Sequence, residues 1–261
     1  MKYIFHFFLL GLILTSSVSF AQVPPEIEDS WTIGINKLPS RTVIWPSPTV
    51  SEAKVSGYEN AAWVKSLNGD WQFNWSPDPD SRPIDFYKLN YNRADWKTIP
   101  VPSTIERQGF GVPLYVNIIY PFKVDPPNVM GVPDSSFTNF NQRNPVGSYT
   151  RTFTVPDDWL NQQIIVHFAG ISSAAFIWVN GKKVGYSQGS RLPAEFDITD
   201  FIKKGENLLA VEVYKYCDGS YLEDQDFWRL TGIYRDVFIR TVPKVSFWDA
   251  YAEPEVDLKN N

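Results

Sequence analysis

Short β-favouring runs follow one another along most of this chain, with turn signals between them. The runs cover residues 148–155, 164–168, 174–179, 183–186, 208–214 and 233–242. Asn180-Gly181 stands between the third and fourth runs and predicts a two-residue hairpin turn. No segment shows sustained helical periodicity, and only residues 157–160 and 198–203 are candidates for short helices. Many short strands joined by turns predict an all-β fold, a two-sheet β-sandwich of jelly-roll type.

The composition narrows the possible functions. Lys and Arg total 24 against 29 Asp and Glu, and the net charge of −5 argues against nucleic-acid binding, which needs clustered cations. Aromatic residues make up 16% of the chain, too many for a disordered protein. Cys217 is the only cysteine, and His6 and His167 are the only histidines. An intramolecular disulfide is therefore impossible, and neither a histidine-based zinc site nor a Ser-His-Asp triad is expected.

The first 21 residues have the pattern of a signal peptide. Lys2 provides a positive start, residues 3–14 are almost entirely apolar, and Ser19-Phe20-Ala21 is a small-x-small cleavage sequence. The apolar run is well short of the roughly 20 residues that a membrane span requires, and no later segment is apolar enough to span. The sequence thus predicts an exported protein, periplasmic or extracellular, with no membrane span after cleavage.

The remainder divides into three parts. Residues 22–62 are expected to form an extended N-terminal arm, loose over residues 22–30. Trp45 could anchor this arm to the surface. Residues 63–243 are the predicted jelly-roll domain. Residues 244–261 look like the start of a linker or next domain that is cut short.

One strand of the predicted domain has a distinct buried face. Trp71, Phe73 and Trp75 alternate along it, after an Asn68-Gly69 turn, and are expected to be core residues rather than a sugar platform. His167 and Cys217 are also expected to be structural, with Cys217 partly buried.

Two segments carry residues suited to binding. Residues 218–229 contain four carboxylates within nine positions, interleaved with Tyr221, Phe227 and Trp228. Carboxylates can hold hard cations or accept hydrogen bonds from sugar hydroxyls, and aromatic faces can stack on sugar rings. A solvated acidic loop is the alternative interpretation. In residues 111–121, Asn117 is a lone amide among apolar residues, which suits a polyol ligand, or else a turn or cap.

These segments also carry a family resemblance. The sequence DGSYLEDQDFWRLTGIYRDV, with VPSTIERQGFGVPLYVNIIYPF, SLNGDWQFNW and WVNGKKVGYSQGSRLPAEFDIT, resembles the N-terminal sugar-binding domain of glycoside hydrolase family 2 β-galactosidases. The motifs occur in the family's order over residues 38–242. The resemblance implies a galactose-binding-like jelly roll that precedes an immunoglobulin-like domain and a catalytic barrel.

The resemblance assigns roles to two residues. Asn117, in the Y-x-N-x-x-Y-P motif, would contact the galactosyl group of the substrate. Asp226, the second Asp of DQD, would face the same pocket and ligate a sodium ion whose other ligands come from the barrel. Magnesium is a further cofactor of the full-length family, and this chain alone would hold none. The segment 103–106 departs from the family's common S-N-W pattern.

No catalytic residue is expected in this chain. Retaining glycosidases use two carboxylates about 5 Å apart, and the resemblance places both on the barrel, one of them in an Asn-Glu pair. Asn-Glu does not occur in this sequence, and only 19 residues follow Val242, against roughly 250 for a barrel. The predicted function is therefore the non-catalytic sugar-binding domain of an exported β-galactosidase, whose partners are the galactoside and the missing barrel. A stand-alone carbohydrate-binding module and an inactive fragment of a broken gene are the alternatives.

Overall fold

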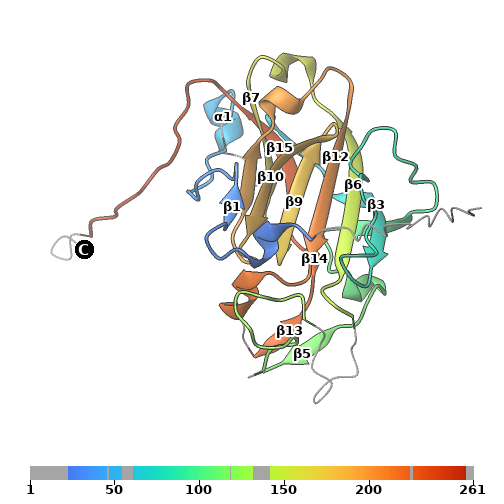
Figure 1. Ribbon diagram of the computed structural model, residues 1–261. Coiled ribbons are helices and arrows are strands. Elements are labelled where there is room, and N and C mark those ends of the chain that lie inside the picture. The colour runs from blue at the N-terminus through green and yellow to red at the C-terminus, as the bar shows by residue number, and fades with distance from the viewer. Residues whose placement is uncertain are drawn as a thin grey trace, which may run out of the picture.

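The computed structural model contains two main antiparallel sheets. It describes residues 23–45, 47–54, 61–117, 119–131, 142–223 and 226–256. The larger sheet has the order β1 (Gly34–Ile35), β10 (Lys182–Gln188), β9 (Ala174–Val179), β12 (Glu206–Tyr214), β6 (Val146–Thr154), β3 (Gly69–Ser76) and β4 (Lys97–Val101). The smaller sheet has the order β11 (Ala194–Asp197), β7 (Gln163–Phe168), β15 (Val237–Val242) and β2 (Val64–Ser66) (Figure 1).

The two sheets enclose one apolar core. Phe73, Tyr149 and Val211 reach it from the larger sheet, and Val166 and Ile239 from the smaller. All five are fully buried. The all-β sandwich predicted from the sequence is confirmed.

Two short ribbons and several single turns of helix complete the described structure. The ribbons are β5 (Leu114–Val116) with β13 (Phe227–Arg229), and β8 (Ile171–Ser172) with β14 (Gly232–Ile233). The helical turns are α1 (Val50–Ala53) and 3-10 turns at Pro25–Glu28, Glu106–Gln108, Asp157–Trp159, Thr199–Phe201 and Asp218–Tyr221. The two short helices predicted from the sequence are therefore present as 3-10 turns.

The predicted hairpin forms where the sequence places it. Asn180 and Gly181 have φ values of 52° and 83° and join β9 to β10. Positive φ at both central residues is the requirement of the type I′ turn, which an Asn-Gly pair meets with little strain. The predicted strand over residues 233–242 is wrong in part, because residues 234–236 interrupt it between β14 and β15.

Both faces of the larger sheet are covered. Its inner face lines the core, and a second apolar cluster covers its outer face, where Phe176, Trp178 and Tyr214 pack with Ile27 and Phe86. This double coverage explains why all six residues of β9 are buried and why its sequence is continuously apolar. The expectation that residues 22–30 are loose is wrong for the described part, because Ile27 is fully buried.

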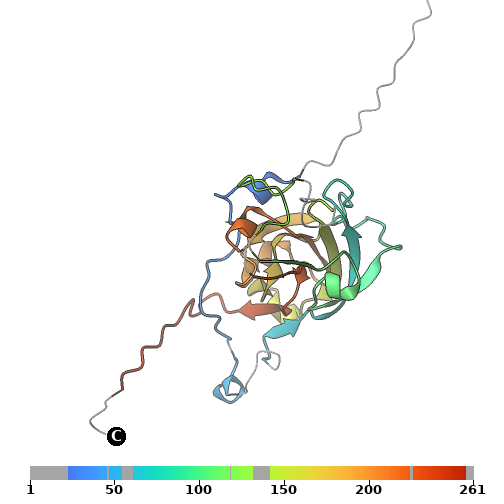
Figure 2. The ribbon, with the colours of Figure 1, turned by 90° about the horizontal axis from the view of Figure 1, so that it is seen from below.

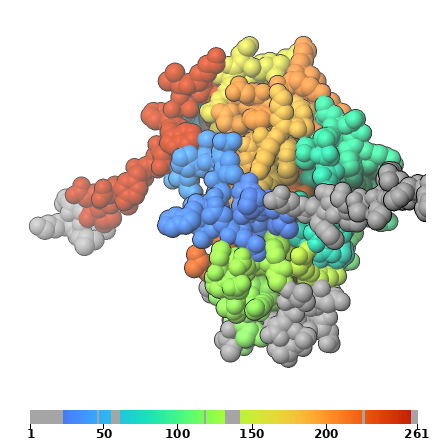
Figure 3. All heavy atoms as spheres, viewed as in Figure 1, coloured from blue at the N-terminus to red at the C-terminus, as the bar shows by residue number. Residues whose placement is uncertain are grey.

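The N-terminal arm is part of the fold. Its β1 pairs with β10 as an edge strand, next to Gly185, where a Cβ atom would lie 2.3 Å from the carbonyl oxygen of Ile35. Only glycine permits this approach. In the space-filling view the arm lies against the body of the sandwich (Figure 3). Among the described residues, no helix is long and apolar enough to cross a membrane.

An ionic cluster lies beneath the arm on the outer face of the smaller sheet. Glu195 accepts from Arg41 of the arm at 2.7 Å and from Arg240 of β15 at 3.0 Å, and its Oε1 lies 3.0 Å from His167 Nδ1. Burial favours the neutral carboxyl, but the hydrogen bond from His167 and the charge of Arg240 outweigh it and lower the pKa of Glu195. His167 is therefore structural, as expected, and Trp45 packs on Phe238 with ring centroids 5.0 Å apart.

The predicted core face of β3 is largely correct. Trp71 and Phe73 are fully buried, whereas Trp75 is only half-buried at the edge of the core. Cys217 is more deeply buried than expected, at 1% exposed, and its Sγ lies 3.2 Å from Ser173 Oγ.

Candidate sugar-binding site

The predicted site residues meet at the end of the ribbon formed by β5 and β13. Figure 1 shows these two strands side by side at one end of the sandwich. Val116 is paired with Phe227 in the antiparallel register, so Asn117 and Asp226 occupy the next positions on the two strands. The structure thus brings together two residues that are far apart in the sequence.

The two faces of this ribbon differ in character. Side chains alternate between faces along a strand, and directly paired residues share a face. Tyr115 and Trp228 are a direct pair, and Asn117 and Asp226 continue the same alternation. All four are exposed, whereas Val116 on the opposite face is 3% exposed. The exposed face of the ribbon therefore carries one amide, one carboxylate and two aromatic rings.

Direct contacts join the members of this exposed group. The Tyr115 hydroxyl donates a hydrogen bond to Asp226 Oδ1. The pKa of Tyr115 is raised, because only the neutral phenol can donate this hydrogen bond and ionisation would break it. The Tyr115 and Trp228 rings meet edge to face, with centroids 5.7 Å apart. Such a surface can stack on a sugar ring while the carboxylate and amide bind its hydroxyls.

The three described carboxylates of residues 218–226 do not converge. Asp218 is buried, which raises its pKa, and it accepts from Gln188 Nε2 at 3.0 Å. Glu223 accepts from the backbone N–H and the hydroxyl of Ser190, at 2.6 and 2.5 Å. Asp224 lies outside the described residues. Asp226 alone of the described three lies on the exposed ribbon face, so the interpretation as one acidic cation site is not supported.

The donor set at the ribbon end is compatible with part of a hard-cation site. Asp226 offers a carboxylate, Asn117 an amide oxygen and Tyr115 a phenol oxygen, the ligand types that hard cations accept. Among the described residues, no group of three or more His, Cys, Asp or Glu side chains could hold a metal ion. A cation at Asp226 would thus need further ligands from outside this set.

The sequence analysis did not identify Tyr115 as a member of the site, and it named Trp228 only as one of several aromatic residues in the acidic segment. The strands that pair them are three residues long, and their alternation becomes visible only after the pairing is known. A usable signal was the position of Tyr115 two residues before Asn117, and of Trp228 two residues after Asp226, since such spacing in strands places side chains on one face.

Comparison with known proteins assigns the family. The model of the glycosyl hydrolases family 2 sugar binding domain matches residues 64–243. The β-galactosidase of Priestia megaterium is 38% identical over 227 residues, 85% of this chain and 21% of that protein. The β-galactosidase of Vibrio vulnificus strain CMCP6 is 47% identical over 194 residues, 74% of this chain and 18% of that protein.

The fold has a solved counterpart. The crystal structure of a Bacteroides uniformis β-glucuronidase superposes with a TM-score of 0.50 and 24% identity, covering 69% of this chain and 18% of that one. That likeness supports the fold. The chain belongs to glycoside hydrolase family 2, in which it corresponds to the sugar-binding domain. It spans about a fifth of the length of the curated relatives it matches.

Proposed function

We propose that this chain is the sugar-binding domain of an exported β-galactosidase, in which Asn117 and Asp226 shape the galactosyl subsite. The observation that carries the proposal is the register of β5 and β13, which sets the two side chains at adjacent positions on an exposed face. The hydrolysis of terminal β-galactosides would then use two carboxylates supplied by a catalytic barrel outside this chain. The signal-peptide pattern of residues 1–21, which lie outside the described residues, supports the proposal that the protein is exported.

Asp226 would also contribute one ligand to a sodium ion in the assembled enzyme. Tyr115 donates to one oxygen of this carboxylate, which leaves the other oxygen available for a cation or a hydroxyl. Sodium would supply a positive charge that sugar hydroxyl oxygens can coordinate. Asn117 would orient the same sugar through its amide, which can donate and accept at once.

A chimaera tests the subsite role. Residues 64–243 would replace the matching segment of the Vibrio vulnificus β-galactosidase, and kcat/KM would be measured on a chromogenic galactoside. Asn117→Ala and Asp226→Ala should each lower kcat/KM by about 10- to 100-fold, the loss of one hydrogen bond to a polar or charged partner. Asn161→Ala and Asp95→Asn alter similar, exposed side chains elsewhere and should leave kcat/KM unchanged. Equal values for all four variants would reject the assignment.

The exposed pair Tyr115 and Trp228 favours one competing function, a carbohydrate-binding module that acts alone. Titration of the purified protein with galactose in sodium buffer separates the two. A partial subsite should bind galactose weakly, because two polar groups on an open surface cannot offset the freedom that the ligand loses. Micromolar affinity that Asp226→Ala abolishes would establish the stand-alone module instead.

A further inference from the structure

Two aromatic rings on the β5–β13 ribbon are not used by the galactosyl subsite proposed above. The rings belong to Tyr115 and Trp228, which are 49% and 54% exposed. Exposed apolar groups that lie together mark interaction sites, whereas single ones do not. Residues 247–256, at the end of the described chain, point away from this ribbon in two perpendicular views, so they do not cover the rings (Figures 1 and 2). The rings are thus open to a ligand.

The rings lie one step along the strands from the two polar residues of the candidate site. Tyr115 pairs directly with Trp228, and Asn117 and Asp226 each lie two residues nearer the end of the ribbon. Two residues of a strand span about 7 Å, which is similar to the step from one ring to the next in a β-linked disaccharide. A galactosyl group held by Asn117 and Asp226 can therefore place the unit bonded to it over the two aromatic rings.

The two rings form a corner. Their planes meet at 62°, with the centroids 5.7 Å apart. A pyranose ring that lies flat on Trp228 would therefore meet Tyr115 at its side. The Tyr115 hydroxyl also donates to Asp226, which ties the orientation of its ring to the carboxylate of the galactosyl subsite.

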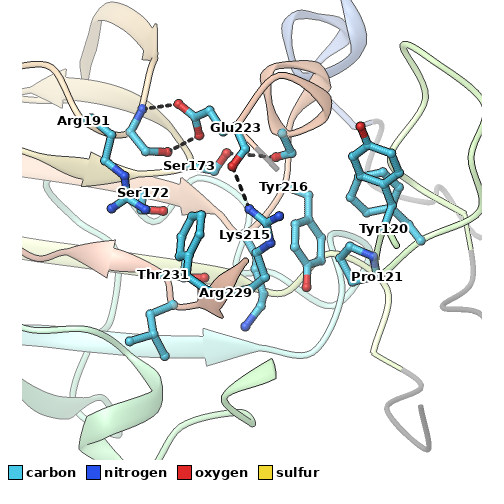
Figure 4. Close-up of a pocket in the computed structure, with 15 residues that line it drawn as sticks. Tyr120, Pro121, Ser172, Ser173, Arg191, Lys215, Tyr216, Glu223, Arg229 and Thr231 are labelled. Carbon is cyan, nitrogen blue, oxygen red and sulfur yellow. Dashed lines mark hydrogen bonds between the residues drawn. The ribbon is translucent and has the colours of Figure 1, made fainter. Parts of the chain in front are cut away.

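The opposite face of the ribbon has no room for a sugar. Phe227 and Arg229 face inward onto a cavity that Tyr216 and Thr231 also line (Figure 4). The volume of this cavity is about 30 Å³, enough for one water molecule and far too small for a sugar ring. Val116, on the same inward face, is buried. A second sugar can thus bind to this ribbon only on its outer face, which the packed inner face supports.

We propose that Tyr115 and Trp228 form the subsite for the sugar bonded to galactose, and that Trp228 determines specificity for disaccharides over galactosides of small alcohols. This inference rests on the galactosyl subsite proposed above. One face of a pyranose ring consists largely of C–H groups, which pack on an aromatic ring, while its hydroxyls remain in water. Rings that are half exposed suit such a ligand, because they cover one face of it and leave the rim hydrated.

The chimaera described above tests this inference with a pair of substrates. The second unit is glucose in lactose and a methyl group in methyl β-galactoside, and kcat/KM is measured for both. Trp228→Ala should lower the lactose-to-methyl ratio of kcat/KM about tenfold, the factor that corresponds to about 50 Å² of apolar surface left uncovered. Trp228→Phe keeps a smaller ring and should recover part of the ratio.

Leu89→Ala is the matched control, because Leu89 is 56% exposed in the segment between β3 and β4. This variant should keep the wild-type ratio. Asn117→Ala should also keep the ratio, since it should lower kcat/KM for both substrates by the same factor.

The ratio does not depend on how much of a variant folds, because one preparation cleaves both substrates. A Trp228→Ala ratio equal to that of Leu89→Ala would overturn the inference and indicate that the two rings pack against a neighbouring domain. The galactosyl subsite would survive that result if Asn117→Ala still lowered both kcat/KM values, so the two proposals fail separately.

Discussion

Trp71→Ala should remove about 3–5 kcal/mol from the free energy of unfolding. Trp71 is 1% exposed and lies between the sheets, with its ring edge to face on Tyr149 at 6.4 Å. A buried aromatic side chain takes about 150–250 Å² out of water, which at roughly 25 cal/mol per Å² is about 4–6 kcal/mol. Because alanine keeps the Cβ atom and the core relaxes in part, the expected loss of stability is smaller, about 3–5 kcal/mol, as is measured for other truncations of buried aromatic residues to alanine.

A hydrogen bond adds to this loss. Trp71 Nε1 donates to the carbonyl oxygen of Leu67 at 2.9 Å, in a buried position. Trp71→Phe retains most of the apolar contact but leaves that carbonyl oxygen without its donor. This variant should lose about 1–2 kcal/mol, and the difference between the two variants separates packing from hydrogen bonding.

Urea unfolding monitored by circular dichroism measures both losses, and a melt should show Tm lowered by roughly 6–20 °C. Trp31→Ala is the matched control, because Trp31 is 94% exposed and its truncation should cost less than about 0.5 kcal/mol. If Trp71→Ala cost no more than Trp31→Ala, the core face assigned to β3 would be refuted.

Three further perturbations follow from the buried and exposed ionisable groups. Glu195→Gln should lower the free energy of unfolding by about 3–5 kcal/mol at neutral pH, because it leaves the buried Arg41 and Arg240 without their carboxylate. Since the pKa of Glu195 is lowered in the folded state, its stabilising contribution is present above the unfolded-state pKa of about 4.3 and is lost as pH falls through the folded-state pKa. Urea unfolding should therefore give the wild type and the variant similar stabilities below that pH. Burial raises the pKa of the Cys217 thiol to about 12, so a thiol-specific chromogenic disulfide should react with it in urea but not in the native protein at pH 8, and rapid native labelling would contradict its burial. Asp226→Asn should lower the pH at which Tyr115 ionises, since the carboxylate is what raises the pKa of Tyr115; an ultraviolet titration, with Tyr115→Phe subtracted, should show no shift if the hydrogen bond is absent.

The sequence predicted the parts of the fold whose information is local. β9 is a continuous apolar run that a turn-forming Asn180-Gly181 pair ends, and both features are visible within ten residues. β4 contains Pro100, a residue that argues against an interior strand when only the sequence is considered. The structure accommodates that proline because β4 is the edge strand of its sheet, where a missing N–H breaks no interior ladder.

The remaining features depend on contacts between distant segments. Ile27 is buried because it helps to cover the outer face of the larger sheet, and no local pattern near residue 27 reveals this. The site was predicted residue by residue from family resemblance, and Asn117 and Asp226 do lie together. The spacing of two residues indicates a shared face within each strand, but the pairing of the two strands could not be derived, because strands of three residues have too little alternation to fix a register.

The ribbon that carries the candidate site is too short to be stable alone, so its inward face must hold it in place. Phe227 lies opposite Val116, and the guanidinium groups of Arg191 and Arg229 approach its ring to 4.9 and 4.8 Å. Phe227→Ala should therefore loosen the ribbon while sparing the sandwich. Hydrogen exchange of the β5 and β13 amides should accelerate about tenfold or more, the effect of roughly 1.4 kcal/mol of local stability, while β9 amides exchange as in the wild type. If the β9 amides exchanged faster by the same factor, Phe227 would stabilise the whole domain. The stability of the candidate site would then be that of the entire sandwich and would not depend on local packing beneath the ribbon.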